Sequence, residues 1–213
     1  MTDFAILLGG DVEPTPRLAR QLKGRRVIAA DSGMRHAEPL GLVPELWTGD
    51  FDSVAPEMKD GFPDIPREIF PVDKDATDGE IAIEAALQRG GRSLLLAGAF
   101  GGPRPDHAFL HMAMALSLAE RGLDVLLTSG DQEGVPLLPG PSEYDYAPGT
   151  LFSVVGFTAL SGLTLAGAKW PLDAHEVAFG SSLTLSNAVA DRLSVNLLEG
   201  RAMLIAHTGP EAR

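Results

Sequence analysis

The stretch GDFDS, from Gly49 to Ser53, contains two aspartates that could hold a metal ion. Asp50 and Asp52 flank Phe51 and follow PELWT, a short apolar run typical of a strand. Such a pair by itself is more often a turn, because aspartate bonds readily to nearby backbone groups. In an extended backbone, however, both carboxylates would serve one site while Phe51 points away into packing. The pair therefore predicts either a solvated turn or one part of a site.

Polar residues also follow the other apolar runs that we expect to be strands. Because ligands of parallel α/β sheets bind at the carboxyl ends of the strands, these residues are predicted to meet at one edge. Carboxylates without cysteine suit a hard cation, and Mg²⁺ typically takes one or two carboxylates together with phosphates and water. Glycine-rich turns let backbone N–H groups approach phosphate oxygens. The residues concerned are Gly9, Gly10, Asp11, Asp31, Ser32, Gly33, Gly49, Asp50, Asp52, Ser53, Asp73, Lys74, Asp75, Thr77, Asp78, Gly101, Gly102, Arg104, Asp106 and His107.

Each residue in this group has a purely structural interpretation as well. Thr77 and Asp78 fit a helix start, where a hydroxyl caps and an acid complements the helix dipole. Asp106 fits a helix cap equally well. His107 and His111 have the spacing of zinc ligands on a helix, but H-E-x-x-H is absent and a packed or solvent-facing pair is favoured. Neither a Walker A pattern nor G-x-G-x-x-G occurs, so the joint occurrence of carboxylates carries the prediction of a metal and phosphate site.

Composition excludes several classes of function. The chain has 213 residues and a net charge of −12, which disfavours nucleic acid or an anionic membrane surface as a partner. There is no cysteine, so disulfides, thiolate metal sites and a cysteine nucleophile are excluded. Because no long apolar span or signal peptide is evident, we expect a cytoplasmic protein. An anionic ligand remains compatible with this charge if a divalent cation bridges it to the carboxylates.

The first half of the chain alternates between expected strands and helices. A helix is predicted after Thr77, which has capping-box spacing to Glu80, with Gly90 at its end. A second is predicted over about 106–121, ending at Gly122. Short apolar runs separated by helices are typical of βαβ units and a parallel sheet. The runs cover Phe4 to Gly10, Arg25 to Gly33, Ser93 to Gly102 and Leu123 to Asp131.

The remainder of the chain favours antiparallel β structure. After about Gly140, short β-rich runs are separated by Gly, Ser, Asn and Asp turns, with no convincing helix. The stretch from Pro136 to Gly149 contains four prolines and is predicted to be a linker. We therefore expect an α/β domain over 1–135, with a Rossmann-like parallel sheet in three layers, and a small β-sandwich domain over 141–213.

Five ordered motifs together resemble the thiamine pyrophosphokinase family over nearly the whole chain. They are GDFDS, KDATDGEIA, GAFGGPRPDH, GLTLAGAKWPL and FGSSLTLSN. The resemblance implies an α/β nucleotide-binding domain, a β-sandwich, a homodimer and Mg²⁺. It also implies that ATP and thiamine react to give thiamine diphosphate and AMP.

The resemblance assigns roles residue by residue. It implies catalytic roles for Asp50, Asp52, Asp78 and Asp106, and metal binding for the first three. The loop GGPRPDH is one residue longer than the family motif and has two prolines, and the direction of Arg104 depends on this loop. As a hypothesis, Asp78 orients or deprotonates the thiamine hydroxyl. The resemblance places Asp31, Ser53, Lys74, Asp75, Thr77, Arg104 and His107 at ATP, and Trp170, Thr184, Ser186 and Asn187 at thiamine.

Other functions fit parts of the same pattern. A pyrophosphokinase acting on a pterin alcohol is the nearest alternative, although the tail with Trp170 matches the thiamine case. A metal-dependent nucleotide phosphohydrolase would need no acceptor. A non-catalytic binding module would bind ligand without turnover.

Overall fold

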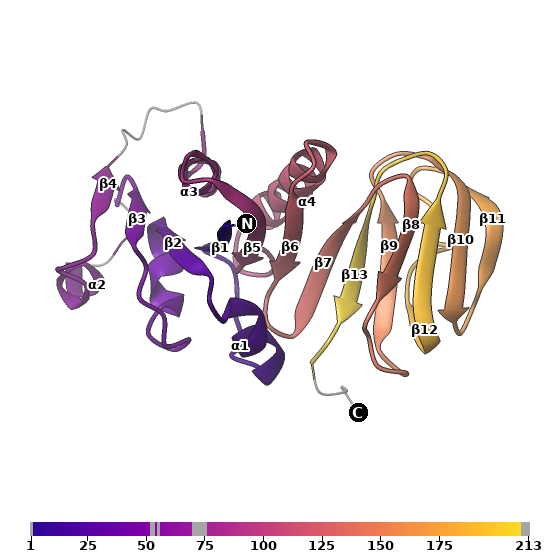
Figure 1. Ribbon diagram of the computed structural model, residues 1–213, viewed down its shortest axis with the longest axis horizontal. Coiled ribbons are helices and arrows are strands. Elements are labelled where there is room, and N and C mark those ends of the chain that lie inside the picture. Colours follow the sequence, from indigo (N-terminus) through magenta and orange to yellow (C-terminus); the bar gives the residue numbers. More distant parts are fainter. Residues whose placement is uncertain (1, 52–53, 55, 70–75, 210–213) are drawn as a thin grey trace. The chain divides into compact units, whose positions relative to one another are not determined.

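The computed structural model describes residues 2–51, 54, 56–69 and 76–209. The chain divides into two units (Figure 1). Unit 1 comprises Met1–Phe109 with Leu123–Gly130, and unit 2 comprises Leu110–Gly122 with Asp131–Arg213. The expectation of a parallel α/β part followed by antiparallel β structure is confirmed.

Unit 1 is built on a parallel sheet with the strand order β6-β5-β1-β2-β3-β4. Every neighbouring pair in this order is parallel. The buried strands are almost wholly apolar, as expected where both faces of a sheet are covered. The strands are β1 (Thr2–Leu7), β2 (Arg26–Ala30), β3 (Leu46–Gly49), β4 (Arg67–Ile69), β5 (Gly91–Ala97) and β6 (Asp124–Thr128).

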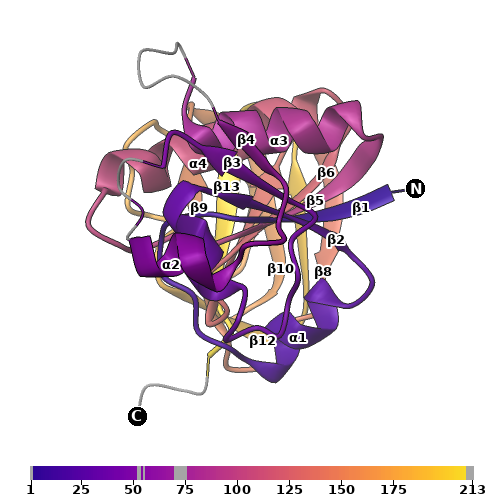
Figure 2. The ribbon, with the colours of Figure 1, turned by 90° about the vertical axis from the view of Figure 1, so that its left-hand side faces the viewer.

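Helices cover both faces of this sheet. Figures 1 and 2 show α3 on one side of the strands and α1 on the other. Leu18 and Leu22 of α1 join a core cluster with β1 and β2, while Ala82 and Ala86 of α3 are also buried. The helices of unit 1 are α1 (Pro16–Leu22), the 3₁₀ helix η1 (Asp31–His36), α2 (Pro56–Gly61) and α3 (Asp78–Gln88), while α4 (Pro105–Glu120) begins in unit 1 and continues in unit 2 from Leu110.

The helix signals in the sequence are confirmed. Thr77 caps α3, and the reciprocal bonds of a capping box with Glu80 are present. Gly90, just beyond α3, has a φ of 85°, and Gly122, just beyond α4, has a φ of 81°. Such left-handed backbone is accessible to glycine at little cost, so both helices end where these residues occur.

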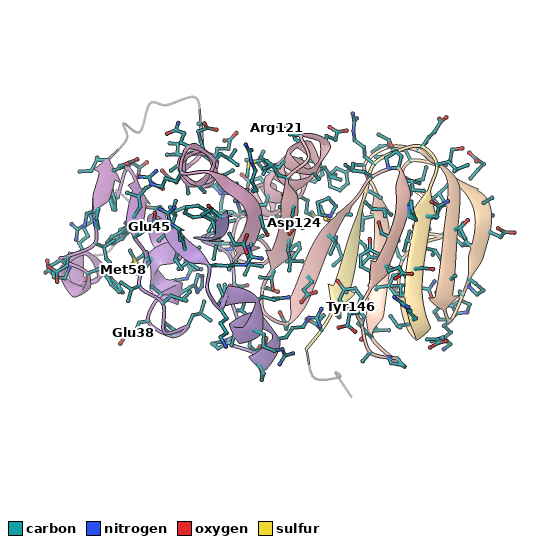
Figure 3. The ribbon with its side chains drawn as sticks, in the orientation of Figure 1. Glu38, Glu45, Met58, Arg121, Asp124 and Tyr146 are labelled. Atoms are coloured by element: carbon teal, nitrogen blue, oxygen red, sulfur yellow. The ribbon has the colours of Figure 1, made fainter. Side chains whose placement is uncertain are left out.

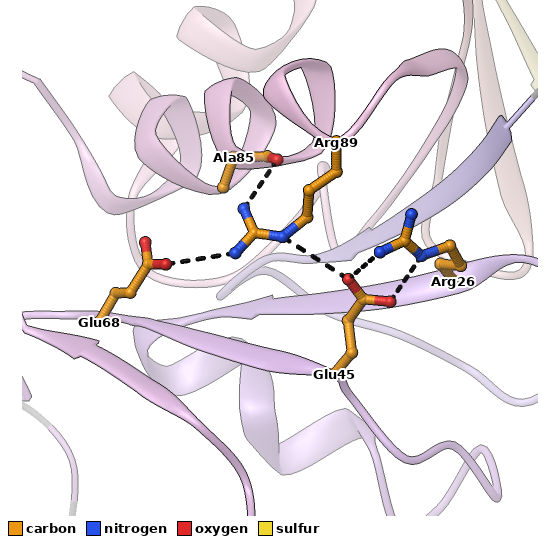
Figure 4. Close-up of polar contacts among 5 residues, drawn as sticks. All are labelled: Arg26, Glu45, Glu68, Ala85 and Arg89. Carbon is orange, nitrogen blue, oxygen red and sulfur yellow. Dashed lines mark hydrogen bonds and ion pairs between the residues drawn. The ribbon is translucent and has the colours of Figure 1, made fainter.

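Ion pairs join the amino-terminal ends of β2 and β3 to the outer strand β4 and to the residue after α3 (Figure 4). Glu45, whose place beside this edge is visible in Figure 3, accepts hydrogen bonds from Arg26 Nε (2.7 Å) and Nη2 (2.6 Å). Arg89, directly after α3, lies 3.7 Å from Glu45 and 3.2 Å from Glu68. The carboxyl end of α3 is thus anchored at this edge, which leaves its amino end, with Asp78, for the opposite edge.

Unit 2 contains antiparallel strands around a separate core. Phe152, Leu163 and Leu193 are fully buried there, and Tyr146 packs into the same cluster (Figure 3). Neighbouring strands pair antiparallel throughout. The strands are β7 (Gln132–Leu137), β8 (Gly140–Tyr144), β9 (Leu151–Gly156), β10 (Leu160–Ala168), β11 (Leu172–Val177), β12 (Asn187–Leu197) and β13 (Ala202–His207).

The predicted linker from Pro136 to Gly149 is wrong over much of its length. The end of β7 and all of β8 lie within it. Pro136 is opposite Met203 of β13, and Pro141 is opposite Asn196 of β12. Proline is tolerated in a strand where no N–H is needed for the ladder, so the prolines did not exclude pairing with strands distant in sequence.

Candidate active site

Three aspartates of unit 1 come together at the carboxyl ends of its strands. Asp31 follows β2, Asp50 follows β3, and Asp78 is the first residue of α3. One carboxylate oxygen from each lies within 4.8 Å of the other two. All three side chains are half-buried. The parallel topology therefore produces the carboxylate cluster that the strand ends predict.

Unusual backbone conformations bring the first two aspartates together. Asp31 has a φ of 44°, and a Cβ built on Gly49 would lie 3.3 Å from the Asp31 Cβ, which is tighter than an ordinary contact. Trp47 Nε1 donates to the Asp31 carbonyl oxygen at 2.8 Å. These contacts therefore hold the carboxyl ends of β2 and β3 close together.

Phe51 packs into the interior as predicted, but its backbone conformation differs from the expected one. Its ring is buried and meets Trp47 edge to face, with centroids 5.0 Å apart. Its φ of 61° is left-handed, so the condition that the backbone be extended is wrong. Burial of the aromatic ring against Trp47 stabilises a turn that leaves Asp50 at the cluster.

Two of the three predicted metal ligands, Asp50 and Asp78, lie in this cluster. Asp50 and Asp78 are joined by Asp31, which the sequence placed at ATP. Three oxygen donors at this separation fit a hard divalent cation such as Mg²⁺. Five of the residues predicted at this edge lie outside the residues that the structure describes, namely Asp52, Ser53, Asp73, Lys74 and Asp75.

Thr77 has the capping role that its spacing to Glu80 predicts. Its hydroxyl accepts from the Glu80 backbone N–H at 3.3 Å and donates to Glu80 Oε2 at 2.9 Å. The Thr77 backbone N–H also donates to Glu80 Oε2, at 2.8 Å. These bonds fix the first turn of α3 and hence the neighbouring Asp78.

Arg104 and Asp106 pair with each other at the start of α4. Arg104 Nη2 lies 2.7 Å from Asp106 Oδ2, and both side chains are well exposed. The Arg104 guanidinium lowers the pKa of Asp106 to about 2, so this carboxyl stays ionised at neutral pH. Within the described part of the chain, Asp106 does not belong to the carboxylate cluster. His107, the next residue, is half-buried and donates its backbone N–H to the Arg104 carbonyl at 3.1 Å.

Arg35 and His36 contact the turn after β1, although no sequence motif indicated them as site residues. His36 Nε2 lies 2.9 Å from the Gly10 carbonyl oxygen, and Arg35 donates to the carbonyls of Gly9 and Gly10. Burial, and then the nearby Arg35 charge, lower the pKa of His36. The only available signal was their position four and five residues after Asp31, close behind an expected strand end.

The predicted thiamine residues lie in unit 2, around the start of β12. Trp170 is 55% exposed, and Lys169 Nζ lies 4.6 Å from the centre of its ring. The buried Asn187 amide donates to the Trp170 carbonyl at 2.8 Å and accepts from its backbone N–H at 3.1 Å. Asn187 therefore holds the backbone that presents the Trp170 ring.

Thr184 and Ser186 shape the loop that precedes β12. The buried Thr184 hydroxyl donates to the Val154 carbonyl at 2.6 Å. Ser186 has a φ of 57° and donates its backbone N–H to Ser153 Oγ at 3.0 Å. Because Thr184 uses its hydroxyl internally, its contribution is to position the loop, whereas the Ser186 side chain is exposed.

A pocket of about 600 Å³ also opens in unit 2, lined by residues 143–146, Pro148, Asp191 and Arg192. Tyr144 and Tyr146 stack there with ring centres 5.9 Å apart. None of the predicted thiamine residues lines this pocket. It is thus separate from the residues that the motifs select.

Comparison with known families accounts for both units. Residues 21–127 match the model of the thiamin pyrophosphokinase catalytic domain, and residues 142–200 match that of the thiamin pyrophosphokinase vitamin B1 binding domain. The chain belongs to the thiamin pyrophosphokinase family. The resemblance inferred from the five motifs is confirmed.

Members of the thiamin pyrophosphokinase family match this chain from end to end. The thiamine pyrophosphokinase of Bacillus subtilis (strain 168) is 26% identical over 98% of this chain and 100% of its own length. The crystal structure of thiamin pyrophosphokinase from Geobacillus thermodenitrificans has a TM-score of 0.80 at 26% identity, covering 100% of this chain and 99% of that one. The crystal structure of thiamine pyrophosphokinase from Bacillus subtilis has the same fold, with a TM-score of 0.83 at 23% identity over 97% of this chain and 99% of that one. In the described part of this thiamin pyrophosphokinase family member, no helix is long and apolar enough to cross a membrane.

Proposed function

We propose that this protein transfers pyrophosphate from ATP to the hydroxyl of thiamine, giving thiamine diphosphate and AMP. The observation that carries the proposal is the cluster of Asp31, Asp50 and Asp78, at the strand ends of a chain that belongs to the thiamin pyrophosphokinase family. Pyrophosphoryl transfer requires little covalent chemistry from the protein. It requires an alcohol placed in line with the β-phosphorus and positive charge at the phosphates.

The described carboxylates have distinct proposed roles. Asp31, Asp50 and Asp78 would hold Mg²⁺, which when bound neutralises charge on the phosphates and on the developing transition state. Asp78 is the first candidate to orient or deprotonate the thiamine hydroxyl, because α3 anchors it rigidly. The roles of Asp52 in metal binding and of Asp106 in catalysis also remain part of the proposal.

ATP binding involves a second group of residues in the proposal. Arg104 and His107, at the start of α4, would lie near the phosphates, although Arg104 is already paired with Asp106. Thr77 would contribute through its control of the α3 start. Ser53, Lys74 and Asp75 are assigned to ATP by their motifs alone.

Trp170 is the proposed platform for thiamine. Thiamine is aromatic and cationic, so stacking on an exposed indole combines apolar contact with cation–π attraction. Lys169 already lies over part of the ring, and thiamine would use the exposed remainder. Asn187, Ser186 and Thr184 would position this platform. On this basis 1–135 would be the nucleotide and metal domain and 141–213 the thiamine domain.

We also propose a homodimer. Large apolar side chains are exposed in unit 2, close in sequence to the thiamine residues: Phe179 is 70% exposed and Leu183 is 53% exposed. Leu185, like Phe179 and Leu183, is exposed and lies between β11 and β12, whereas the exposed Trp170 lies between β10 and β11. Asn187 accepts a hydrogen bond from the Trp170 backbone and so connects the two segments. A second copy of the chain that covered these side chains would remove them from water.

The decisive experiment measures AMP formation from ATP and Mg²⁺ with and without thiamine. AMP formation that depends on thiamine, with thiamine diphosphate as the other product, is the expected result. If AMP formed only in the presence of a pterin alcohol, the acceptor would be that alcohol and not thiamine. Phosphate or diphosphate release without any acceptor would identify a phosphohydrolase, and ligand binding without turnover would identify a binding module.

A further inference from the structure

Arg35 is an exposed cation at the same strand edge as the carboxylate cluster. It lies on η1, four residues after Asp31. A single nitrogen, Nη2, donates to the carbonyl oxygens of Gly9 at 2.5 Å and Gly10 at 2.8 Å. The guanidinium is therefore fastened to the turn that follows β1.

This turn occupies the switch point of the parallel sheet. From β1 the chain continues through β2, β3 and β4 on one side, whereas β5 and β6 lie on the other side. Ligands of such sheets bind in the crevice at the switch point, beyond the carboxyl ends of the strands. The anchor of Arg35 is thus part of the crevice where a nucleotide is expected.

The turn is a rigid support. Gly10 donates to the Gly98 carbonyl and Asp11 to the Phe100 carbonyl, both at 2.9 Å, which joins it to the loop after β5. A Cβ on Gly10 would lie 2.3 Å from the Phe100 carbonyl oxygen, so the two backbones meet where no side chain fits. A cation fixed to this turn has a defined position.

Some N–H groups of the Arg35 guanidinium make no hydrogen bond to the residues that the structure describes. A guanidinium has five N–H donors in a planar arrangement, and the bonds to the glycine carbonyls use those of Nη2. Among the residues that the structure describes, Arg35 makes no ion pair, and Nε and Nη1 make no hydrogen bond. Arg104, the arginine that the motifs assign to ATP, is instead paired with Asp106.

Charge balance favours a phosphate as the occupant of these donors. Three clustered carboxylates together with a triphosphate carry more negative charge than one divalent cation neutralises. Arginine is the side chain best suited to phosphate oxygens, because its N–H groups are directional and its charge is permanent.

We infer that Arg35 is a binding residue for the triphosphate of ATP: Nη2 stays on the glycine turn, and Nε or Nη1 donates to a phosphate oxygen. The inference rests on the proposed use of ATP as substrate. It adds a determinant of triphosphate over monophosphate binding that the motifs do not contain. It also explains why an exposed arginine is fixed to a backbone turn and leaves part of its charged group unused.

The test compares Arg35→Gln with wild type by calorimetric titration of Mg²⁺·ATP and, separately, of AMP, without thiamine. Gln can still donate to a glycine carbonyl but has no charge. We expect the affinity for Mg²⁺·ATP to fall about 10- to 100-fold, as for loss of a charged hydrogen bond, with AMP affinity within about 2-fold of wild type. Arg35→Lys, which keeps the charge, should lie between the two. Arg20→Gln makes the same charge change at an exposed position on α1 and should bind both nucleotides as wild type does.

Two results would overturn the inference. Unchanged Mg²⁺·ATP affinity in Arg35→Gln would show that no phosphate is bound by Arg35. An equal loss of affinity for ATP and AMP, accompanied by a lower melting temperature, would show that Arg35 only stabilises the turn. If Arg35→Gln does not fold, the same comparison is made with Arg35→Lys. Because these titrations contain no thiamine, they remain decisive even if wild type forms no thiamine diphosphate, which would refute the proposed function alone.

Discussion

At the scale of single residues, the candidate site is a concentration of like charge. Asp31, Asp50 and Asp78 place carboxylate oxygens within 4.8 Å of one another. Two unit charges at such a separation repel by about 1 kcal/mol even in water, and by more where water is partly excluded. A protein that holds this arrangement is predisposed to bind a cation, and each carboxylate should favour metal binding at some cost to the metal-free fold.

Asp31→Asn tests this balance. We expect the variant to lose most of the rise in melting temperature that Mg²⁺ gives wild type, and its rate of AMP formation to fall at least about 100-fold. Without Mg²⁺ its melting temperature should equal or exceed that of wild type, because a repulsion is removed. Thermal unfolding with and without Mg²⁺ measures both effects. Asp64→Asn, at an exposed position outside the cluster, is the matched control, and an unchanged Mg²⁺ response in Asp31→Asn would refute the cluster as a metal site.

His36 predicts a pH dependence of stability. Burial and the Arg35 charge lower its pKa, while the Gly10 carbonyl and Asp11 oppose that shift. The unfolded chain therefore takes up a proton near the ordinary pKa of 6.5 before the folded chain does, so the stabilisation is complete above this value and is lost as pH falls below it. Urea unfolding at pH 7.5 and 5.5 should show a smaller pH effect in His36→Gln than in wild type. His175→Gln, at an exposed site, should keep the wild-type profile; the same profile in His36→Gln would contradict the assignment.

At the scale of elements, the site depends on how helices and turns begin and end. The first turn of α3 is fixed by the capping box of Thr77 and Glu80, and its far end by Arg89. The turn after β1 is fixed by backbone bonds to the loop after β5. Both supports lie outside the carboxylate cluster but determine where its neighbours are placed.

Removing the cap should weaken both the fold and the site. Thr77→Ala is expected to lower the free energy of unfolding by about 1 kcal/mol, the usual value of an N-cap side chain. It should also lower the rate of AMP formation, because Asp78 is the next residue. Thr77→Ser keeps the hydroxyl and should restore most of both quantities. Urea unfolding and the AMP assay measure them, and full activity in Thr77→Ala would show that Asp78 does not need this support.

The glycine turn after β1 should tolerate no side chain. In Gly10→Ala the new Cβ would lie 2.3 Å and 2.4 Å from two carbonyl oxygens, so the backbone must move. We expect a loss of about 1–3 kcal/mol in the free energy of unfolding, as for overpacked sites. Gly61→Ala, where nothing lies within 4 Å of the new Cβ, is the control and should be close to neutral. Equal stability of the two variants in chemical unfolding would contradict the close approach.

At the scale of the whole molecule, two units of different architecture are both matched by thiamin pyrophosphokinase family models. The carboxylate cluster belongs to the parallel unit, and Trp170 and the loop before β12 belong to the antiparallel unit. The net charge of −12 is compatible with a cationic substrate and a divalent metal. The proposed dimer would cover large apolar side chains that are exposed in the antiparallel unit.

Phe179→Asp tests the proposed dimer. A charge in a covered apolar contact should shift sedimentation toward the monomer at micromolar protein, at least about 10-fold in dissociation constant. Val43→Asp changes an even more exposed apolar side chain in the other unit and should leave association unchanged. Sedimentation of wild type as a monomer at every concentration would refute the dimer itself.

Local features of the structure were predictable where local interactions determine them. The α3 cap at Thr77 and the helix ends at Gly90 and Gly122 follow from neighbouring residues, as does the alternation of apolar strands with helices. The segment from Pro136 to Gly149 was misinterpreted because its strands are stabilised by pairing with β12 and β13, which are distant in sequence.

The sequence by itself determined the family, the order of architectures and the strand ends at which the aspartates occur, because motif order and periodicity are properties of the chain. Only the tertiary structure decided that Asp31 joins Asp50 and Asp78, and that Arg35 is fastened to the turn after β1. These groupings depend on parallel strands that end, and on α3 that begins, at one edge of the sheet, and on left-handed backbone at residues such as Asp31 and Phe51. Contacts of that kind arise between segments far apart in the chain, so no local pattern records them.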